Sequence, residues 1–385
     1  MPLSDIKVLD LCRARSGPTC VRLLSQMGAQ VIRIEDPGGA DIGERHHFDF
    51  QNLHPNKRSL TLNLKSKRGR DIFLKLAEQA DVVVENYRAD VKHRLRIDYD
   101  TLSQLNPRLV YASISGFGQT GRDRDRPGFD QIAQGMSGVM TVNGEPGQGP
   151  LLVGLPIADL SAGTMAAYGI VLALFERERS GKGQWVHTSL LQAVIHLMDH
   201  QAARFLITGD VAKQNGNNHP LFGASGVYKA RDGEFMIQAA GDVMFERLCK
   251  AVGAPELLQD ERFSTRSSRF EYRFDFHDEI ERRLATKDAA EWVDILTRAA
   301  VPAGPIFDVE QCFEDEQTQS LPLRAPVHHP LLGDMTLLGC GVNLERTPAR
   351  FTSAAPEPGQ HTDEVLSELG YSAEDVASLR QAGDV

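Results

Sequence analysis

The first half of the chain alternates between short apolar runs and longer segments with helical periodicity. The runs are rich in Val, Ile and Leu, as strands are, and each ends in a polar or glycine-containing loop. Strands separated by helices predict an α/β fold, with a parallel sheet covered by helices on both faces. The expected strands are residues 6–11, 30–35, 58–64, 81–87, 109–118 and 185–191, and the expected helices include residues 20–28, 66–80 and 160–179.

The carboxyl ends of these strands are where we expect chemistry. Ligands of parallel α/β sheets bind beyond those ends. The loops that follow Leu11, Val84 and Ile114 are therefore the first candidates for a site.

After Gly209 the pattern changes. Residues 226–240 read as a hairpin that turns at Asp232 and Gly233, and charged helical segments follow to about residue 300. We interpret residues 220–320 as a smaller α+β domain.

Composition narrows the class of protein. Apolar residues make up 41% and charged residues 24%, and no apolar run approaches the roughly 18 residues of a membrane span. The chain starts without a basic and apolar leader, and its five cysteines show no CxxC spacing. A net charge of −10 argues against nucleic acid as a partner. We expect a cytoplasmic protein that binds neither nucleic acid nor membrane.

One stretch is basic within this acidic chain. Residues 57–96 hold eleven Lys and Arg but only five Asp and Glu, a net of about +6. Solvated helix faces account for Lys67, Arg68 and Arg70, whereas a docking surface for a polyphosphate would account for the whole stretch. Composition does not decide between the two.

Asp159 stands at the start of the expected helix 160–179, whose first turns carry small residues. It could be a helix N-cap, which accepts hydrogen bonds from first-turn amides. Alternatively it is a reactive carboxylate, which those amides stabilise as an anion by roughly 0.3–1 kcal/mol. The small residues behind it would allow a ligand or another backbone to approach closely.

A carboxylate at this position suits acyl transfer between acids. Aspartate has an ordinary pKa of about 3.9, so it is ionised at neutral pH and needs no general base. A Ser or Cys nucleophile would need a positioned His, and no such motif is evident. Attack of Asp159 on a thioester would form a mixed anhydride and then an aspartyl thioester, provided that water is excluded.

Several segments, in order along nearly the whole chain, resemble the class III CoA-transferases. They are VLDL…ARSGPTC, GAQVIRIEDPGG, NKRSLTLNLK, DVVVENYR, SISGFGQTG, PGFDQIAQGMSG, ADLSAG…FERERSGKGQ and GQHTDEVLSELGYS. The resemblance implies that Asp159 is the nucleophile, supported by Arg15, Phe129 and Asp130. It also implies a CoA thioester as substrate, with no permanently bound cofactor and no metal. The implied CoA contacts are Arg15, Ser16, Leu62, Asn63, Leu64, Lys65, Asn86, Tyr87, Arg88 and Arg94, to which we add Arg126.

The resemblance also implies a fold and a partner. Each chain would form a ring from a large Rossmann-like domain and a small domain, and two rings would interlock as a homodimer. The expected boundaries are a large domain at 1–195, linkers at 196–219 and 321–335, a small domain at 220–320, and a return to the large domain at 336–385.

Two departures from the family pattern bear on the ligands. Asp36 follows Glu35 where many relatives carry Arg, so a cation for the CoA phosphates is absent or supplied by Arg33 or Arg126. The region NHPLFGASGVY replaces the glycine-rich loop of formyl-CoA transferase, which argues against an oxalate/formate enzyme. A dicarboxylate acceptor with succinyl-CoA as donor is the expected pair, with His219, Arg15 and the amides of residues 223–226 as candidate contacts.

Three alternative functions fit the sequence less well. An α-methylacyl-CoA racemase needs two acid/base groups, and its second is a His where this chain has Phe129, which carries no proton. A non-catalytic CoA-binding protein would not need to retain Asp159. A dinucleotide oxidoreductase would show G-x-G-x-x-G after the first strand, where this chain has CRARSGP. The pairs His46-His47 and His328-His329 lack nearby ligand partners in sequence and are interpreted as surface histidines.

Overall fold

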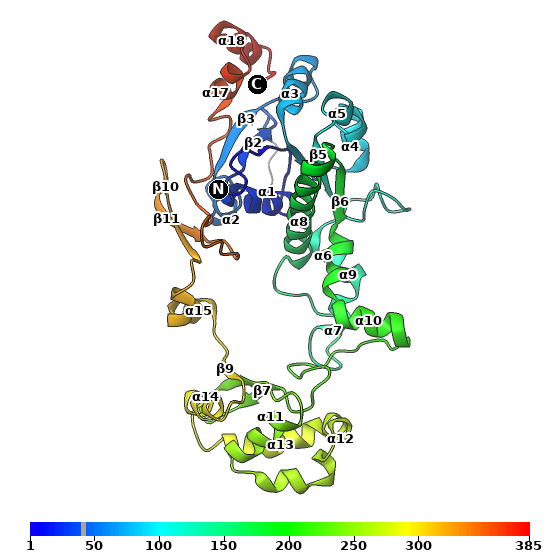
Figure 1. The fold of residues 1–385 in the computed structure, drawn as a ribbon, viewed down its shortest axis with the longest axis vertical. Coiled ribbons are helices and arrows are strands. Elements are labelled where there is room, and N and C mark those ends of the chain that lie inside the picture. The colour runs from blue at the N-terminus through cyan, green and yellow to red at the C-terminus, as the bar shows by residue number, and fades with distance from the viewer. Residues whose placement is uncertain (40–43) are drawn as a thin grey trace. The chain divides into compact units, whose positions relative to one another are not determined.

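The computed structural model describes residues 1–39 and 44–385, which divide into two compact units. The first comprises residues 1–139, 152–210 and 320–385, and the second comprises residues 140–151 and 211–319. Figure 1 labels many of the elements of both.

The first unit is built on a six-stranded sheet with the order β3-β2-β1-β4-β5-β6, in which every pair is parallel. The expected parallel α/β arrangement is thus confirmed. The order reverses between β1 and β4, so the loops after these two strands lie at the switch point where such sheets bind ligands. The strands are β1 (Lys7–Asp10), β2 (Gln30–Glu35), β3 (Lys57–Thr61), β4 (Val82–Glu85), β5 (Val110–Ser115) and β6 (Trp185–Ser189).

Both faces of this sheet are buried under helices. Because successive side chains of a strand point to opposite faces, each strand contributes to two hydrophobic clusters. Val8 and Val31 belong to one hydrophobic cluster, and their neighbours Leu9 and Ile32 belong to the other. One face is covered by α1 (Ser16–Gln26), α6 (Asp130–Ser137), α8 (Ile157–Ser180) and α9 (Leu190–Leu197). The other is covered by α3 (Lys67–Gln79), α5 (Tyr99–Leu105), α17 (Thr362–Glu368) and α18 (Ala373–Gln381).

The helix α8 is longer than predicted and starts before Asp159. By length and composition it could cross a membrane, but half of its apolar window is buried within the protein. Its buried residues pack in the same cluster as α1 and α9, as in the central helix of a globular core. Tyr168, Leu172 and Phe175, also on α8, are exposed.

The second unit has its own core around a small antiparallel sheet. The predicted hairpin is present as β7 (Gly226–Lys229) and β8 (Glu234–Ile237), and β9 (Ala303–Pro305) pairs with β8. Helix α7 (Val139–Val142) belongs to this unit except for its first residue, which lies in the first unit. The other helices are α11 (Asp242–Ala251), α12 (Arg266–Glu271), α13 (Arg273–Leu284), α14 (Ala289–Arg298), α15 (Val309–Glu314) and α16 (Glu316–Gln319), with 3₁₀ turns at Pro255–Gln259 and Glu261–Phe263.

The observed division differs from the expected boundaries at three places. Residues 140–151 belong to the second unit, where Gln214 Nε2 donates to the carbonyl oxygens of Asn143 (2.7 Å) and Gly149 (2.6 Å). The expected linker 196–219 contains the helix α10 (Asp199–Thr208). The expected linker 321–335 contains β10 (Arg324–His329) and the start of β11 (Gly333–Leu338), which pair as a hairpin.

Candidate active site

A buried ion pair at the end of β1 anchors the loop that follows this strand. Asp10 Oδ2 lies 2.9 Å from Lys57 Nζ, and both side chains are fully buried. Asp10 Oδ1 accepts the amide of Cys12 at 2.9 Å, while Lys57 also contacts His54 Nδ1 at 3.1 Å. Burial lowers the pKa of His54 well below its ordinary value, so its ring is neutral and accepts from Lys57. Because a buried charge is costly when unpaired, this set fixes the first residues of the loop.

The same loop is held from the side by Asn86, which follows β4. Its Oδ1 accepts the amide of Arg13 at 2.9 Å, and its Nδ2 donates to the Arg13 carbonyl at 2.7 Å. The next residue, Ala14, adopts a φ of 57°, a left-handed conformation that a non-glycine residue keeps only when its surroundings impose it. The side-chain amide of Asn86 thus joins the loops after β1 and β4 at the switch point.

Asp159 lies in the first turn of α8, two residues after the helix begins at Ile157. The N-cap interpretation is therefore wrong, because the capping position is Pro156. The cap comes instead from Asp130, whose Oδ1 accepts the amides of Ala158 at 2.7 Å and Asp159 at 3.3 Å.

Two glycines allow the backbone to approach this point. A Cβ on Gly163 would lie 2.5 Å from the carbonyl oxygen of Ser16, so the glycine lets α8 pack directly on the start of α1. A Cβ on Gly128 would lie 2.6 Å from the Cα of Gly116, so this pair joins the loop after β5 to the segment that carries Asp130.

The surroundings of Asp159 raise its pKa to about 6. Burial is the main cause, the negative charge of Asp130 is the second, and Arg15 and hydrogen bonds from the hydroxyl and amide of Ser16 act in the opposite direction. Asp159 is accordingly an anion for most of the time at neutral pH, and it is a more basic one than an exposed aspartate.

A cavity of about 260 Å³ opens onto Asp159. Of the residues predicted from sequence, it brings together Ser16, Asn86, Tyr87, Arg88, Arg126, Phe129 and Asp159. Arg13, Ala14, Ile114, Ser115, Gly116, Arg124, Pro127, Gly128 and Leu190 complete the lining. The loops after β1, β4 and β5 all contribute, as expected for the carboxyl edge of the sheet.

Arg15 is held by a partner from another helix, and its predicted roles as active-site support and CoA contact stay predictions. Its guanidinium pairs with Asp49 of α2 (Phe48–Leu53) at 2.6 Å, and the residue is outside the lining of the cavity. It still lies close enough to Asp159 to lower the pKa of that carboxyl group.

Other predicted contacts also lie outside this lining. The side chains of Leu62 and Leu64 are buried in the core. The amide of Asn63 donates to the carbonyl of Asp384 at 2.8 Å, and the side chain of Lys65 is 80% exposed. Arg94, on α4 (Ala89–Leu95), is 3.8 Å from Asp90 and is also exposed. Their role as CoA contacts stays a prediction, as does that of His219 and residues 223–226, which belong to the second unit.

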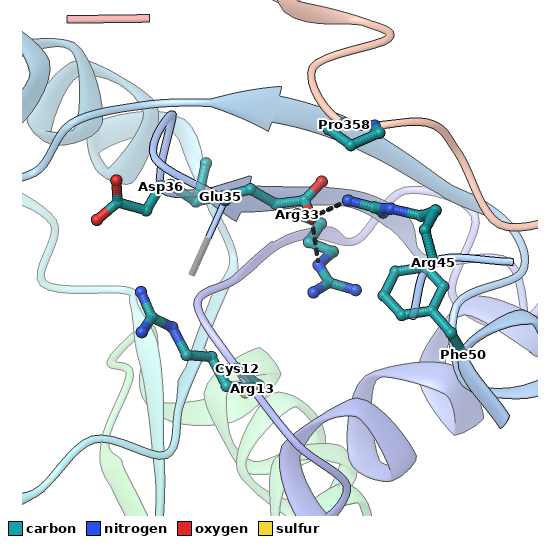
Figure 2. A pocket seen from close by; sticks show the side chains of 10 residues that line it. Cys12, Arg13, Arg33, Glu35, Asp36, Arg45, Phe50 and Pro358 are labelled. Atoms are coloured by element: carbon teal, nitrogen blue, oxygen red, sulfur yellow. Dashed lines mark hydrogen bonds and ion pairs between the residues drawn. The ribbon is translucent and has the colours of Figure 1, made fainter. Parts of the chain in front are cut away.

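Sequence reasoning missed Arg13, which lines both this cavity and a second one of about 190 Å³. Figure 2 shows the second cavity, at the carboxyl end of β2. Arg45 and Arg33 turn toward Glu35 there, at 2.5 and 3.5 Å from its Oε1. The position of Arg13 in the CRARSGP loop was a signal, because that loop was already expected to carry chemistry. The full lining is Cys12, Arg13, Arg33, Ile34, Glu35, Asp36, Gly39, Arg45, Phe50 and Pro358.

The histidine pairs have a carboxylate partner that their sequence neighbourhood does not show. Glu357 Oε1 lies 2.8 Å from His46 Nε2 and 3.6 Å from the Nε2 of His329, which is buried. The surface interpretation is therefore wrong for His329. Its Nδ1 accepts the amides of Leu331 and Leu332, so the neutral ring carries its proton on Nε2 and donates toward Glu357. A metal ion would need that same nitrogen deprotonated, so the contact is better explained as a structural one.

An ionisable carboxylate thus lies in a cavity at the switch point of a doubly wound sheet, where α/β proteins bind their ligands. Residues 3–362 match the profile of CoA-transferase family III. The chain belongs to this family and is a CoA-transferase.

Individual relatives agree with this assignment over nearly the whole chain. The chain is 33% identical to a succinyl-CoA–D-citramalate CoA-transferase of Chloroflexus aurantiacus, over 98% of this chain and 97% of the relative. It is 34% identical to a succinate–glutarate CoA-transferase of Agrobacterium fabrum, over 96% of both. A crystal structure of a CAIB/BAIF family protein from Brucella suis superposes with a TM-score of 0.83 at 31% identity, covering 96% of this chain and 99% of that one.

Proposed function

We propose that the protein moves CoA from a donor acyl-CoA to a free carboxylic acid through covalent intermediates on Asp159. The observation that carries this proposal is the placement of Asp159, which faces a cavity at the carboxyl edge of the sheet with a pKa of about 6. At neutral pH it is mostly ionised and can attack without a general base.

The transfer proceeds in four balanced steps. A carboxylate oxygen of Asp159 attacks the thioester carbon, and the C–S bond breaks to give a mixed anhydride and the CoA thiolate. The thiolate attacks the aspartyl carbon, releasing the donor acid and leaving an aspartyl thioester. The acceptor carboxylate attacks that carbon and expels the thiolate, which then attacks the acceptor acyl carbon and releases Asp159. No water enters, so the thioester bond is conserved.

Each tetrahedral stage needs donors for its oxyanion. The amides of Ala158 and Asp159 already donate to Asp130. The Ser16 amide hydrogen-bonds the Asp159 carboxyl group and is therefore our first candidate for a donor to the oxyanion. Arg15 and the amides of residues 223–226 are further candidates.

For substrates we propose succinyl-CoA as donor and a dicarboxylic acid as acceptor. The relatives from Chloroflexus and Agrobacterium bear names of this kind. The cavity also offers Arg13, Arg88 and Arg126 as cations that could hold the second carboxylate of either acid.

We also propose an interlocked homodimer in the cytoplasm. Exposed apolar side chains on α8 and α10, including Tyr168, Phe175, Leu206 and Ile207, would be covered by a second copy. All five cysteines are free thiols, which suits a reducing compartment. The molar mass from light scattering after size-exclusion chromatography tests the dimer. The mass of a monomer at micromolar concentration would refute it.

The central experiment incubates the enzyme with acyl-CoA donors and traps acyl-aspartyl species with hydroxylamine before peptide mass spectrometry. We expect a hydroxamate on the peptide that contains Asp159, and none in Asp159→Ala. Glu176→Ala is the matched control, because it removes an exposed carboxylate from the same helix. Label on a different residue, or undiminished transfer in Asp159→Ala, would refute the route. Exchange of an α-proton with D₂O without transfer would instead favour a racemase.

A further inference from the structure

The second cavity borders the first at Arg13. It is formed at the carboxyl ends of β1 and β2, and Asp36 directly follows the last residue of β2. In the dinucleotide-binding members of this fold class, an acidic residue beyond the glycine-rich turn accepts a ribose hydroxyl group, whereas a nearby Arg accommodates a phosphate on that ribose. We apply the same chemistry to Asp36.

The two cavities share Arg13, which makes them parts of one elongated site. At about 190 and 260 Å³, each is smaller than the roughly 300–1,000 Å³ of pockets for drug-sized ligands. A CoA thioester, larger than such ligands, needs both when its thioester lies at Asp159. Its diphosphate would then pass Arg13 at the junction.

The charges of the second cavity are distributed unequally. Of the three arginines that line its described part, Arg33 and Arg45 turn toward Glu35, at the far end from Asp36 (Figure 2). The carboxylate of Asp36 accepts the amide of Gly38 at 3.0 Å, which lowers its pKa and keeps it ionised.

The cation that pairs with Asp36 does not reverse this charge. Lys65 Nζ lies 3.5 Å from Asp36 Oδ2, and its side chain is 80% exposed. The charges of Lys65 and Asp36 offset each other, and Arg13, whose charge also lowers the pKa of Asp36, is the cation that we place at the diphosphate. Among the described lining residues, no further arginine is then left at this edge of the cavity for a phosphomonoester.

On this basis we infer that Asp36 determines how the enzyme recognises the ribose of the donor: its carboxylate accepts ribose hydroxyl groups, and the 3′-phosphate of CoA gains no dedicated cationic pocket. The inference rests on the proposed function, since it assumes a CoA thioester that reaches Asp159. Thioesters of 3′-dephospho-CoA, which carry two free ribose hydroxyls, are then used about as well as CoA thioesters.

The test compares succinyl-CoA with succinyl-3′-dephospho-CoA as donors. For the wild type we expect kcat/KM values within about threefold of each other, the range of a weak exposed charge interaction. Asp36→Arg should favour the 3′-phosphorylated donor by roughly ten- to hundredfold, because arginine pairs strongly with phosphate. Asp36→Asn keeps an acceptor for the Gly38 amide, and should shift the preference in the same direction but less.

Asp5→Arg is the control for the change in net charge. Asp5 is exposed and precedes β1, at the opposite edge of the sheet from Asp36. This variant should keep the wild-type ratio. Calorimetric binding of CoA and 3′-dephospho-CoA provides the same comparison without turnover.

The outcomes separate this inference from the proposed function. A wild-type preference for the 3′-phosphate above about tenfold, or an unchanged ratio in Asp36→Arg, overturns the role of Asp36 while leaving the aspartyl route intact. Absence of transfer from either donor, with equal binding of both CoA forms, refutes the proposed function and supports the role of Asp36.

Discussion

Asp130 Oδ1 accepts the backbone amide of Asp159 at 3.3 Å, together with that of Ala158 at 2.7 Å. One carboxylate therefore caps the helix that carries the other and also repels its charge. First-turn amides ordinarily stabilise a nearby anion. Here two of them are directed to Asp130 instead. Burial, and after it the negative charge of Asp130, raise the pKa of Asp159 to about 6.

This relationship predicts a pH dependence. The donor kcat/KM should fall as pH drops below about 6, because protonation of Asp159 removes the nucleophile. Asp130→Asn keeps an oxygen acceptor for the helix amides but removes the negative charge, so the midpoint should move to lower pH. It should stay above about 3.9, since burial is the larger cause of the shift.

The measurement is a pH–rate profile of wild type and Asp130→Asn, with Asp125→Asn in an exposed loop as the control. An unchanged midpoint in Asp130→Asn would show that the two carboxylates do not interact in solution.

The raised pKa also predicts that the nucleophile reduces stability. A carboxyl group whose pKa is higher in the folded than in the unfolded protein stabilises the fold below the unfolded pKa, and this contribution is lost as pH rises through the folded pKa. For Asp159 the loss falls between about 4 and 6. Asp159→Asn should therefore be more stable than wild type by about 1–3 kcal/mol above pH 6, with little difference near pH 4.

Denaturant unfolding of both proteins at pH 4.5 and pH 8 tests this expectation. Equal stability at pH 8 would mean that the carboxylate is better solvated or paired than its position in the cavity indicates.

The strands and the edge of the sheet that carries the site could be predicted from sequence. The run QVIRIE coincides with β2, because apolar residues on both faces leave little alternative for a buried strand. The choice of loops succeeded for the same reason: carboxyl ends of neighbouring parallel strands meet at one edge, whatever the details of each loop.

Side-chain roles at that edge were harder to predict, because they depend on partners far away in the chain. Asp159 could not be distinguished from an N-cap, since the actual cap, Asp130, comes from a separate segment. His329 seemed a surface residue because Glu357 meets it only in the folded chain. Leu62 and Leu64 lie within a matched motif, yet their side chains serve the core.

Asn86 provides a third prediction, since its side chain clamps the backbone of Arg13 through two hydrogen bonds. Asn86→Ala should raise KM for the acyl-CoA donor by about tenfold, through loss of the loop conformation that presents Arg13 to both cavities. Asn86→Asp should be worse, because a carboxylate would face the Arg13 carbonyl without a donor.

Steady-state kinetics with donor and acceptor varied separately would test this role. The matched control is Asn106→Ala, which removes a side-chain amide that donates to the backbone carbonyl oxygens of Ala77 and Ala80 instead. An equal rise in the KM of the acceptor acid in Asn86→Ala would contradict a role confined to the donor.

Gly163 offers a fourth prediction, because general helix energetics and local packing disagree about its replacement. Alanine in a helix interior is favoured over glycine by up to about 1 kcal/mol, so Gly163→Ala would stabilise an isolated helix. In the protein its Cβ would lie 2.5 Å from the Ser16 carbonyl oxygen, a backbone atom that cannot rotate away. We expect a net loss of about 1–3 kcal/mol of stability and a fall in kcat, since Ser16 would be pushed from Asp159.

In the control Gly169→Ala, on the same helix, the new Cβ meets Val186 Cγ1, a side-chain atom that can shift. Thermal unfolding and initial-rate assays compare the two variants. Equal stability and equal activity of both would contradict the prediction, because the close contact of α8 with α1 would then not be what positions the nucleophile.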